Sequence, residues 1–390
     1  MNTELKLFVD GIVFQKHAHG GIARIFREIL PRMCEIDRDL HVTLFVDGPL
    51  NQEPPSHHRI VLSRAPAFRR PIRVKGVWKY FLYPFRRVGS KTWNYIRSLW
   101  LGRGQNTIWH STYYTYPIVW DGFQVVTVYD LIHERYSQMF NDPLDNIARR
   151  QKQLCVEKAD AVICISDTTR QDVERFYNKS NGNLFVIPIS FSEVFRYLCT
   201  SDLAPLDIPK QSYFLYVGMR SFNKNFYGLL DVYNAWDHRN DVSLVVVGPQ
   251  WSDDEKRYIK NLALSERVHL MTEVDDETLC QLYNQALALV FPSIYEGFGL
   301  PLLEAMSCGC PVIASNIPSS IEVAGECPIY FDYLQPASLL IAFDEVFLEG
   351  RNSARTKRGL EWVKRFSWDR TALQTLEVYR SMKNVNSIIQ

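Results

Sequence analysis

Two glutamates follow an apolar run in the second half of the chain, within "SIYEGFGLPLLEAMSCGCPVIAS" at 293–315. The glycines of "EGFG" oppose helix and Pro301 suits a first helical position, so we expect Glu296 in a loop and Glu304 in the first turn of the next helix. At the carboxyl ends of parallel strands both carboxylates can reach one crevice, and free amides of the helix start can hold a phosphate there. On spacing alone, a solvated Glu296 and a Glu304 that complements the helix dipole explain the pattern equally well.

Two cations follow an earlier strand of the same half. In "YVGMRSFNKN" the expected strand ends at Gly218, and Arg220 and Lys224 come directly after it. Two cations at the edge of a sheet suit a diphosphate leaving group, because charge develops on its oxygens as the bond breaks. Surface Lys and Arg are usually only solvated, so the two cations indicate a binding site only together with the acidic loop. Together the two stretches predict a cleft that combines carboxylates with cations.

A glycine pair, Gly20 and Gly21, precedes the amphipathic pattern "GGIARIFREILPRM" in the first half. Glycines let backbone amides approach a phosphate, and the amino end of a helix favours its charge. A glycine pair before a helix is often only a turn, so it supports a phosphate site only together with the other motifs.

Short apolar runs rich in β-branched residues alternate with helical patterns in both halves. Six such runs lie between residues 213 and 332, and six more between residues 5 and 189. This alternation is typical of a doubly wound parallel sheet. The expected fold is α/β, with two Rossmann-like domains that face one cleft. The segment 198–211 carries prolines and little apolar periodicity, and we predict that it is the interdomain linker.

The two halves differ in charge, although the net charge of the chain is only +1. Residues 1–200 hold 27 Lys and Arg against 19 Asp and Glu, and residues 201–390 hold 17 against 24. No apolar run reaches the roughly 18 residues that span a bilayer, and the N-terminus lacks the basic region of a signal peptide. We therefore expect a cytoplasmic protein.

These motifs together resemble the retaining, nucleotide-sugar-dependent glycosyltransferases of the GT-B fold, family 4, whose signature is a pair of glutamates eight positions apart. The resemblance covers nearly the whole chain and is stronger in the second half. It implies an acceptor-binding domain at 1–197 and a donor-binding domain at 212–365. It also implies a final helix, within 366–390, that crosses back onto the first domain.

The same resemblance implies a role for each motif. Arg220 and Lys224, with amides near Gly20 and Gly21, would hold the diphosphate, and Glu304 would hydrogen-bond the ribose. Such enzymes are thought to use front-face attack, with the leaving phosphate helping to deprotonate the acceptor. No covalent nucleophile, cofactor or metal would then be required. The transferred sugar would meet Glu296 and the amides of Phe298, Gly299 and Leu300.

One position departs from the family pattern. Many relatives carry a histidine after the strand that reads "VVTVYDL" here, where it contacts the sugar, but this chain has Tyr129. Asp130 at the carboxyl end of the strand could contact the acceptor or the sugar, or could cap a helix. His133 could take the missing role, although a lone histidine is more often structural. We name Asp130 and His133 as candidate catalytic residues beside Glu296.

Metal-binding patterns are weak. "DRD" at 37–39 matches the D-x-D of metal-dependent transferases by letter, but it follows the end of the first helix pattern, so we expect a solvated turn. Cys308 and Cys310 stand at an expected helix-turn-strand junction, and no second cysteine pair accompanies them. Reduced, buried thiols are the simpler interpretation. We predict no metal.

The span from Pro54 to Trp120 contains no Asp or Glu. Its basic residues alternate with aromatics, which suits an anionic membrane surface, where each cation contributes about 1 kcal/mol. Nucleic acid attracts the same cations, and a positive face that balances the acidic second domain is a third explanation. From the resemblance we favour membrane apposition or docking of a lipid-diphosphate-linked acceptor in region 54–120. The residues assigned to it are Arg69, Arg70, Arg73, Lys75, Trp78, Arg86 and Arg87.

The sequence thus predicts a transferase, peripheral on the inner face of the cytoplasmic membrane, that moves a hexose with retention in surface polysaccharide synthesis. The acceptor would be lipid-linked or an oligosaccharide. GDP-mannose is the leading donor, and UDP- or dTDP-linked sugars stay open. Two other classes stay open: a GT-B-fold epimerase or phosphorylase, and a non-catalytic glycan- or nucleic-acid-binding protein. The sequence does not indicate the linkage or the oligomeric state.

Overall fold

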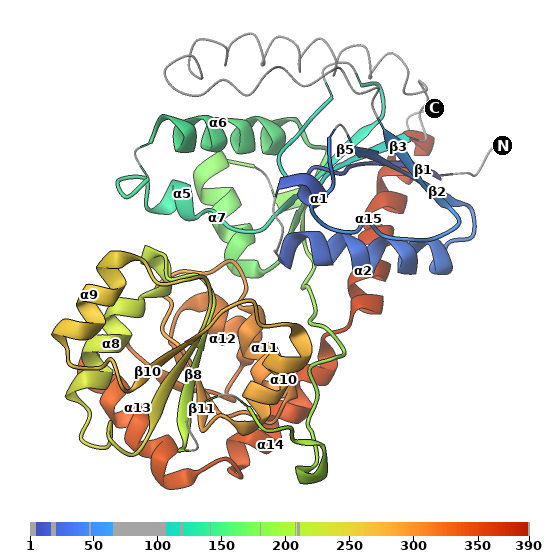
Figure 1. The fold of residues 1–390 in the computed structure, drawn as a ribbon. Coiled ribbons are helices and arrows are strands. Elements are labelled where there is room, and N and C mark those ends of the chain that lie inside the picture. Colours follow the sequence, from blue (N-terminus) through green and yellow to red (C-terminus); the bar gives the residue numbers. More distant parts are fainter. Residues whose placement is uncertain are drawn as a thin grey trace. The chain divides into compact units, whose positions relative to one another are not determined.

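The computed structural model describes residues 5–16, 21–46, 48–64, 107–117, 120–140, 142–179, 181–206, 208 and 211–388. The chain forms two compact units (Figure 1). Unit 1 comprises Met1–Ile165, Thr169–Ile189 and Trp368–Gln390, and unit 2 comprises Ser166–Thr168 and Ser190–Ser367. No described helix is both long enough and apolar enough to cross a membrane.

Unit 1 is built on a seven-stranded parallel sheet with the strand order β3-β2-β1-β4-β5-β6-β7. The central strands are buried along their length, as expected where helices cover both faces of a parallel sheet. The strands are β1 Leu5–Asp10, β2 Leu40–Val46, β3 Ile60–Arg64, β4 Thr107–Ser111, β5 Phe123–Val128, β6 Ala161–Cys164 and β7 Leu184–Val186. The described helices are α1 Val13–Lys16, α2 Gly21–Ile36, α5 Ile132–Arg135, α6 Pro143–Lys158, α7 Asp167–Tyr177 and α15 Trp368–Ile388.

The helix α15 belongs to unit 1, although it follows unit 2 in the chain. It packs against α2, the amphipathic helix that the apolar periodicity predicts. Asp369 Oδ1 accepts a hydrogen bond from Arg32 Nε at 3.0 Å, and Arg380 Nη2 donates to Asp37 Oδ2 at 2.8 Å. The final helix therefore returns to the first unit, and one carboxylate of the "DRD" stretch pairs with it.

Unit 2 is built on a six-stranded parallel sheet with the strand order β10-β9-β8-β11-β12-β13. Helices α8 and α13 cover one face, and α10, α11 and α12 cover the other (Figure 1). The strands are β8 Tyr213–Val217, β9 Ser243–Val247, β10 Val268–Met271, β11 Ala288–Phe291, β12 Val312–Ser315 and β13 Ile329–Phe331. The helices are α8 Phe226–Ala235, α9 Asp253–Asn261, α10 Asp276–Gln285, α11 Leu300–Ser307, α12 Pro318–Ala324, α13 Pro336–Glu349 and α14 Ala354–Trp362.

The position of the predicted linker needs correction. The units divide between Ile189 and Ser190, ahead of the segment 198–211. This segment instead lies against α10, where the side chains of Asn284 and Gln281 hydrogen-bond to its backbone. Its described part holds only the short 3-10 helix Thr200–Asp202, and its backbone hydrogen-bonds within unit 2.

Candidate functional site

The strand order of unit 2 reverses between β8 and β11, which is where ligands bind in open α/β sheets. The loops after these two strands carry the motifs that the sequence singled out. Asn223, which sequence reasoning missed, joins the two loops. Its Nδ2 donates to Tyr295 O at 3.1 Å, and its backbone O accepts from Ile294 N at 2.8 Å. Its place between the two predicted cations was the sequence signal that could have found it, and the structure shows it buried.

Lys224 and Glu296 are in direct contact. Lys224 Nζ lies 2.6 Å from Glu296 Oε1, and the two side chains are 20% and 13% exposed. Ser293 Oγ donates to the same carboxylate oxygen at 2.7 Å. An ammonium has three donors, so Lys224 can hold Glu296 and an anion at once. The structure thus brings together one residue predicted for the diphosphate and one predicted for the sugar.

Arg220 is more deeply buried than Lys224 and pairs with Glu255 at the start of α9. Its Nε lies 2.6 Å from Glu255 Oε1, and its Nη2 lies 3.2 Å from Glu255 Oε2. Burial acts to raise the pKa of Glu255, but hydrogen bonds from Arg220 and Ser252 outweigh it and lower that pKa. The sequence predicted Arg220 but not its partner, which lies 35 positions away in the first turn of α9.

Glu304 lies in the second turn of α11, not in the first turn as predicted. The helix begins at Leu300 because Gly299, with φ of +116°, can adopt the left-handed conformation that precedes it. Glu304 is 8% exposed and accepts a hydrogen bond from Tyr283 OH at 3.1 Å. Since the first turn of α11 has no acidic residue, simple complementation of the helix dipole does not explain Glu304.

The amino end of α11 offers backbone donors beside these side chains. Within the part of the chain that the structure describes, the amides of Phe298, Gly299 and Leu300 donate no hydrogen bond. Orphan amides at a helix start carry partial positive charge and suit an anion. They follow Glu296 directly, so carboxylate, ammonium and free amides occur within one loop and its neighbour.

In unit 1, Asp130 lies two residues after the end of β5, in the turn into α5. Its Oδ1 accepts a hydrogen bond from Ile132 N at 3.2 Å, although the N-cap residue of α5 is Leu131 and not Asp130. His133 Nε2 lies 3.9 Å from Asp145 Oδ1 of α6, and its ring packs on Phe140. Tyr129, in place of the family histidine, is buried and donates to Thr112 O at 2.8 Å.

Several predicted residues cannot be placed. Gly21 begins α2, but Gly20 lies outside the described residues. Among the described residues no group of three His, Cys, Asp or Glu side chains could hold a metal, and Cys308 and Cys310 are buried free thiols. Also outside the described residues are Arg69, Arg70, Arg73, Lys75, Trp78, Arg86 and Arg87.

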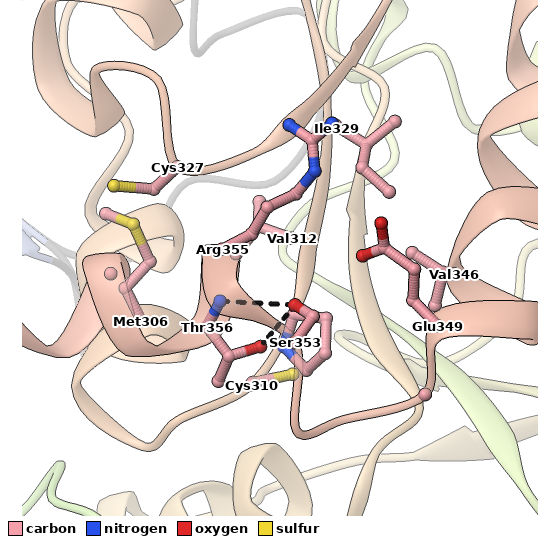
Figure 2. Close-up of a pocket in the computed structure, with 13 residues that line it drawn as sticks. Met306, Cys310, Val312, Cys327, Ile329, Val346, Glu349, Ser353, Arg355 and Thr356 are labelled. Carbon is pink, nitrogen blue, oxygen red and sulfur yellow. Dashed lines mark hydrogen bonds between the residues drawn. The ribbon is translucent and has the colours of Figure 1, made fainter.

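A small cavity lies away from these motifs, at the amino ends of β12 and β13 (Figure 2). It is lined by apolar side chains such as Val312 and Ile329, with Ser353 and Arg355 from the start of α14. Its interior of about 10 Å³ holds roughly one water molecule. The cavity is at the opposite end of the strands from the β8 and β11 loops, so it is no part of the candidate site.

Comparison with known proteins agrees with the sequence motifs. Residues 202–327 match the family model "Glycosyl transferases group 1", and residues 19–189 match "Glycosyltransferase Family 4". O-antigen chain mannosyltransferase B of Escherichia coli is 31% identical over 253 residues, which cover 61% of this chain and 65% of that protein. O-antigen chain mannosyltransferase RfbU of Salmonella typhimurium is 28% identical over 242 residues, which cover 60% of this chain and 65% of that protein. The match thus spans just under two thirds of these relatives.

Solved structures resemble the whole chain. Sucrose-phosphate synthase from Thermosynechococcus elongatus has a TM-score of 0.72 at 22% identity, covering 98% of this chain and 100% of that one. WaaG, a glycosyltransferase involved in lipopolysaccharide biosynthesis, has a TM-score of 0.63 at 14% identity, covering 95% and 98%. At these identities the likeness concerns the fold. It confirms the predicted fold class, two Rossmann-like α/β domains of the GT-B type.

Proposed function

We propose, on the premise that the chain belongs to the glycosyltransferases of group 1 and family 4, that it transfers a hexose with retention from a nucleotide sugar to a growing surface glycan. The observation that carries the proposal is the Lys224–Glu296 contact at the reversal point of the unit 2 sheet, beside the free amides of α11. The names of the O-antigen mannosyltransferases to which the chain is similar support mannose as the sugar.

Each group at this site has a proposed task. The spare donors of Lys224, the guanidinium of Arg220 and the α11 amides would bind the diphosphate and neutralise the charge that develops as it leaves. Glu296 would accept a hydrogen bond from a hydroxyl of the transferred sugar. Glu304, oriented by Tyr283, would accept from the ribose. The leaving phosphate would take the acceptor proton, so the proposal needs neither a covalent nucleophile nor a metal nor a cofactor.

The acceptor is proposed to bind at the carboxyl edge of the unit 1 sheet. Asp130 is half-buried two residues after the end of β5, where a carboxylate can accept a hydrogen bond from a sugar hydroxyl. His133 is the weaker candidate, because its ring faces Asp145 and Phe140 of the neighbouring turn and helix.

Peripheral attachment to an anionic membrane is a separate part of the proposal, and it depends on the basic region 54–120 and on a lipid-linked acceptor. The charge pattern of the sequence supports it. Flotation with anionic liposomes in moderate salt should carry wild-type protein upward and leave a multiple Arg/Lys→Ser variant of this region behind. Equal behaviour of the two proteins would remove this part of the proposal and leave the transfer reaction untouched.

The donor proposal is tested with a panel of GDP, UDP, dTDP and ADP and their common sugar conjugates, with and without magnesium. A ligand at about 100 times its Kd should stabilise the fold by about 2.7 kcal/mol, which a thermal-shift assay detects. A metal-independent rise with GDP and GDP-mannose alone is the expected result. If none of the nucleotides raised the melting temperature, the result would contradict the proposal and favour a binding protein. In a product analysis, free sugar or sugar phosphate as the only product would favour an epimerase or phosphorylase.

A further inference from the structure

The guanidinium of Arg220 is almost fully engaged before any ligand is present. Its Nε and Nη2 contact the two carboxylate oxygens of Glu255, and Nη2 also donates to Pro249 O at 2.9 Å and Gln250 O at 3.0 Å. Its side chain is 3% exposed. Only Nη1 has no hydrogen-bond partner among the described residues. Nη1 is itself buried, and a buried donor without a partner is costly, so Nη1 is the guanidinium nitrogen whose bonding capacity is left for an anion.

The backbone packs closely around Nη1. A Cβ atom on Gly248 would lie 2.9 Å from Nη1 and 2.6 Å from Gly218 O, so only glycine fits where the loops after β8 and β9 meet. On the other side, Trp251 lies against the guanidinium, with its ring centroid 4.5 Å from Arg220 Cζ. Gly248 and Trp251 therefore confine Arg220 to one orientation.

Glu255 makes two sets of contacts with one carboxylate. Besides Arg220, its Oε2 accepts from Ser252 N at 2.7 Å, and Ser252 Oγ accepts from Glu255 N at 3.2 Å, which is a capping box at the start of α9. The start of α9 thus sets the position of the carboxylate, and the carboxylate sets the position of the guanidinium. This chain of contacts links a regular helix to a side chain of the candidate site.

We propose that Glu255 is a positioning residue of the donor site, which holds Arg220 by Nε and Nη2 so that Nη1 alone meets a phosphate of the nucleoside diphosphate. The inference rests on the proposed function, since it assumes that Arg220 binds the donor. It excludes the opposite role, in which Glu255 competes with the phosphate and must release Arg220. The two roles differ in sign, because loss of a competing carboxylate strengthens anion binding and loss of a support weakens it.

The test uses calorimetry to measure the Kd of GDP and of UDP for wild type and for Glu255→Gln. The Kd of the corresponding nucleosides, guanosine and uridine, is measured in the same way. The amide keeps the size of the side chain but loses its charge. We expect diphosphate binding to weaken about tenfold, equal to about 1.4 kcal/mol, and nucleoside binding to stay the same. Tighter or unchanged diphosphate binding in Glu255→Gln overturns the positioning role. Wild-type protein that binds neither these nor other nucleoside diphosphates overturns the proposed function together with the inference.

Three further variants separate positioning from loss of structure. Ser252→Ala removes the helix cap but keeps the Arg220–Glu255 pair, so it should lower stability and leave the diphosphate Kd unchanged. Glu345→Gln makes the same chemical change in an ion pair distant from the loops, where Glu345 lies 2.9 Å from Arg355. It should change neither the stability nor the diphosphate Kd. Arg220→Met combined with Glu255→Gln should bind no more weakly than Arg220→Met alone. Additive losses in that pair would show that Glu255 does not act through Arg220.

Discussion

Two lysine–glutamate pairs lie beside the carboxyl edges of the two sheets, and they differ in their surroundings. In unit 1, Lys152 Nζ lies 3.0 Å from Glu134 Oε2, and the side chains are 6% and 7% exposed. In unit 2, Lys224 and Glu296 are closer and more exposed, at 20% and 13%. Each ammonium lies over an aromatic ring, Tyr114 for the first and Phe291 for the second. The first ammonium also donates to Asp130 O, so the second has one more donor to spare.

The comparison indicates how the same chemistry divides between structure and function. A buried pair whose ammonium also donates to the backbone fixes that backbone, here the turn that carries Asp130. A half-buried pair with donors left over can exchange partners with a ligand. Tyr177 OH adds a hydrogen bond to Glu134 at 2.6 Å, which completes the unit 1 network. We therefore expect the unit 1 pair to govern stability and the unit 2 pair to govern catalysis.

The largest expected effect is the loss of the buried pair. Lys152→Met leaves Glu134 buried without its cation, which should lower the free energy of unfolding by about 3–5 kcal/mol. Urea denaturation measures it. The matched control is Lys256→Met, which removes an exposed ion pair with Asp253 and should change stability by less than about 1 kcal/mol. Equal stability of the two variants would show that the unit 1 pair is not structural.

The next effect concerns the exposed pair. Lys224→Met should lower kcat about 100- to 1,000-fold, as loss of one preorganised donor to a developing charge does in other enzymes. The free energy of unfolding should change by less than about 1 kcal/mol, since Glu296 is left partly solvated. Transfer assays with the donor found by the nucleotide panel measure it, and Lys364→Met on the exposed pair with Glu361 is the control. A large loss of stability with unchanged kcat would reverse the comparison.

The buried carboxylate of Asp10 gives a smaller, pH-dependent effect. Burial raises its pKa, and hydrogen bonds from Thr112 and Thr115 only partly offset this. The folded chain then holds the proton more tightly than the unfolded chain, so this stabilisation is complete below the unfolded pKa and lost as the pH rises through the folded pKa. Asp10→Asn has no charge to lose. Its stability relative to wild type should therefore rise as the pH is raised above about 4, the usual pKa of an aspartate.

Urea denaturation of both proteins across that range measures this difference. Thr43→Val is a suitable control, because it changes a half-buried strand residue that does not titrate, and its difference from wild type should not vary with pH. If the free energy of unfolding of wild type rose relative to that of Asp10→Asn as the pH rises, the result would contradict the direction of the pKa shift.

The sequence predicted the elements and the motif-bearing loops well, but not the partners of the motif residues. Runs of β-branched residues predicted every strand except β3, an edge strand whose Val61 is 60% exposed and so lacks a buried run. Glu255 was missed because its contact with Arg220 depends on the adjacency of β8 and β9. Asp10 and Thr112, 102 positions apart, meet for the same reason, because β1 lies beside β4. Such pairings follow from strand order, which local patterns do not contain.

The smallest expected effect separates the two unit 1 candidates. Asp130→Asn keeps an oxygen that can accept from Ile132 N but removes the charge, and we expect kcat/KM for the acceptor to fall about tenfold, in line with a hydrogen bond to a charged group. His133→Gln should change kcat/KM less than about twofold, because its ring packs on Phe140 beside Asp145. Initial rates at varied acceptor and saturating donor measure both. If His133→Gln were the slower variant, the histidine would hold the role that Tyr129 vacates, and the unit 1 edge would be catalytic as well as structural.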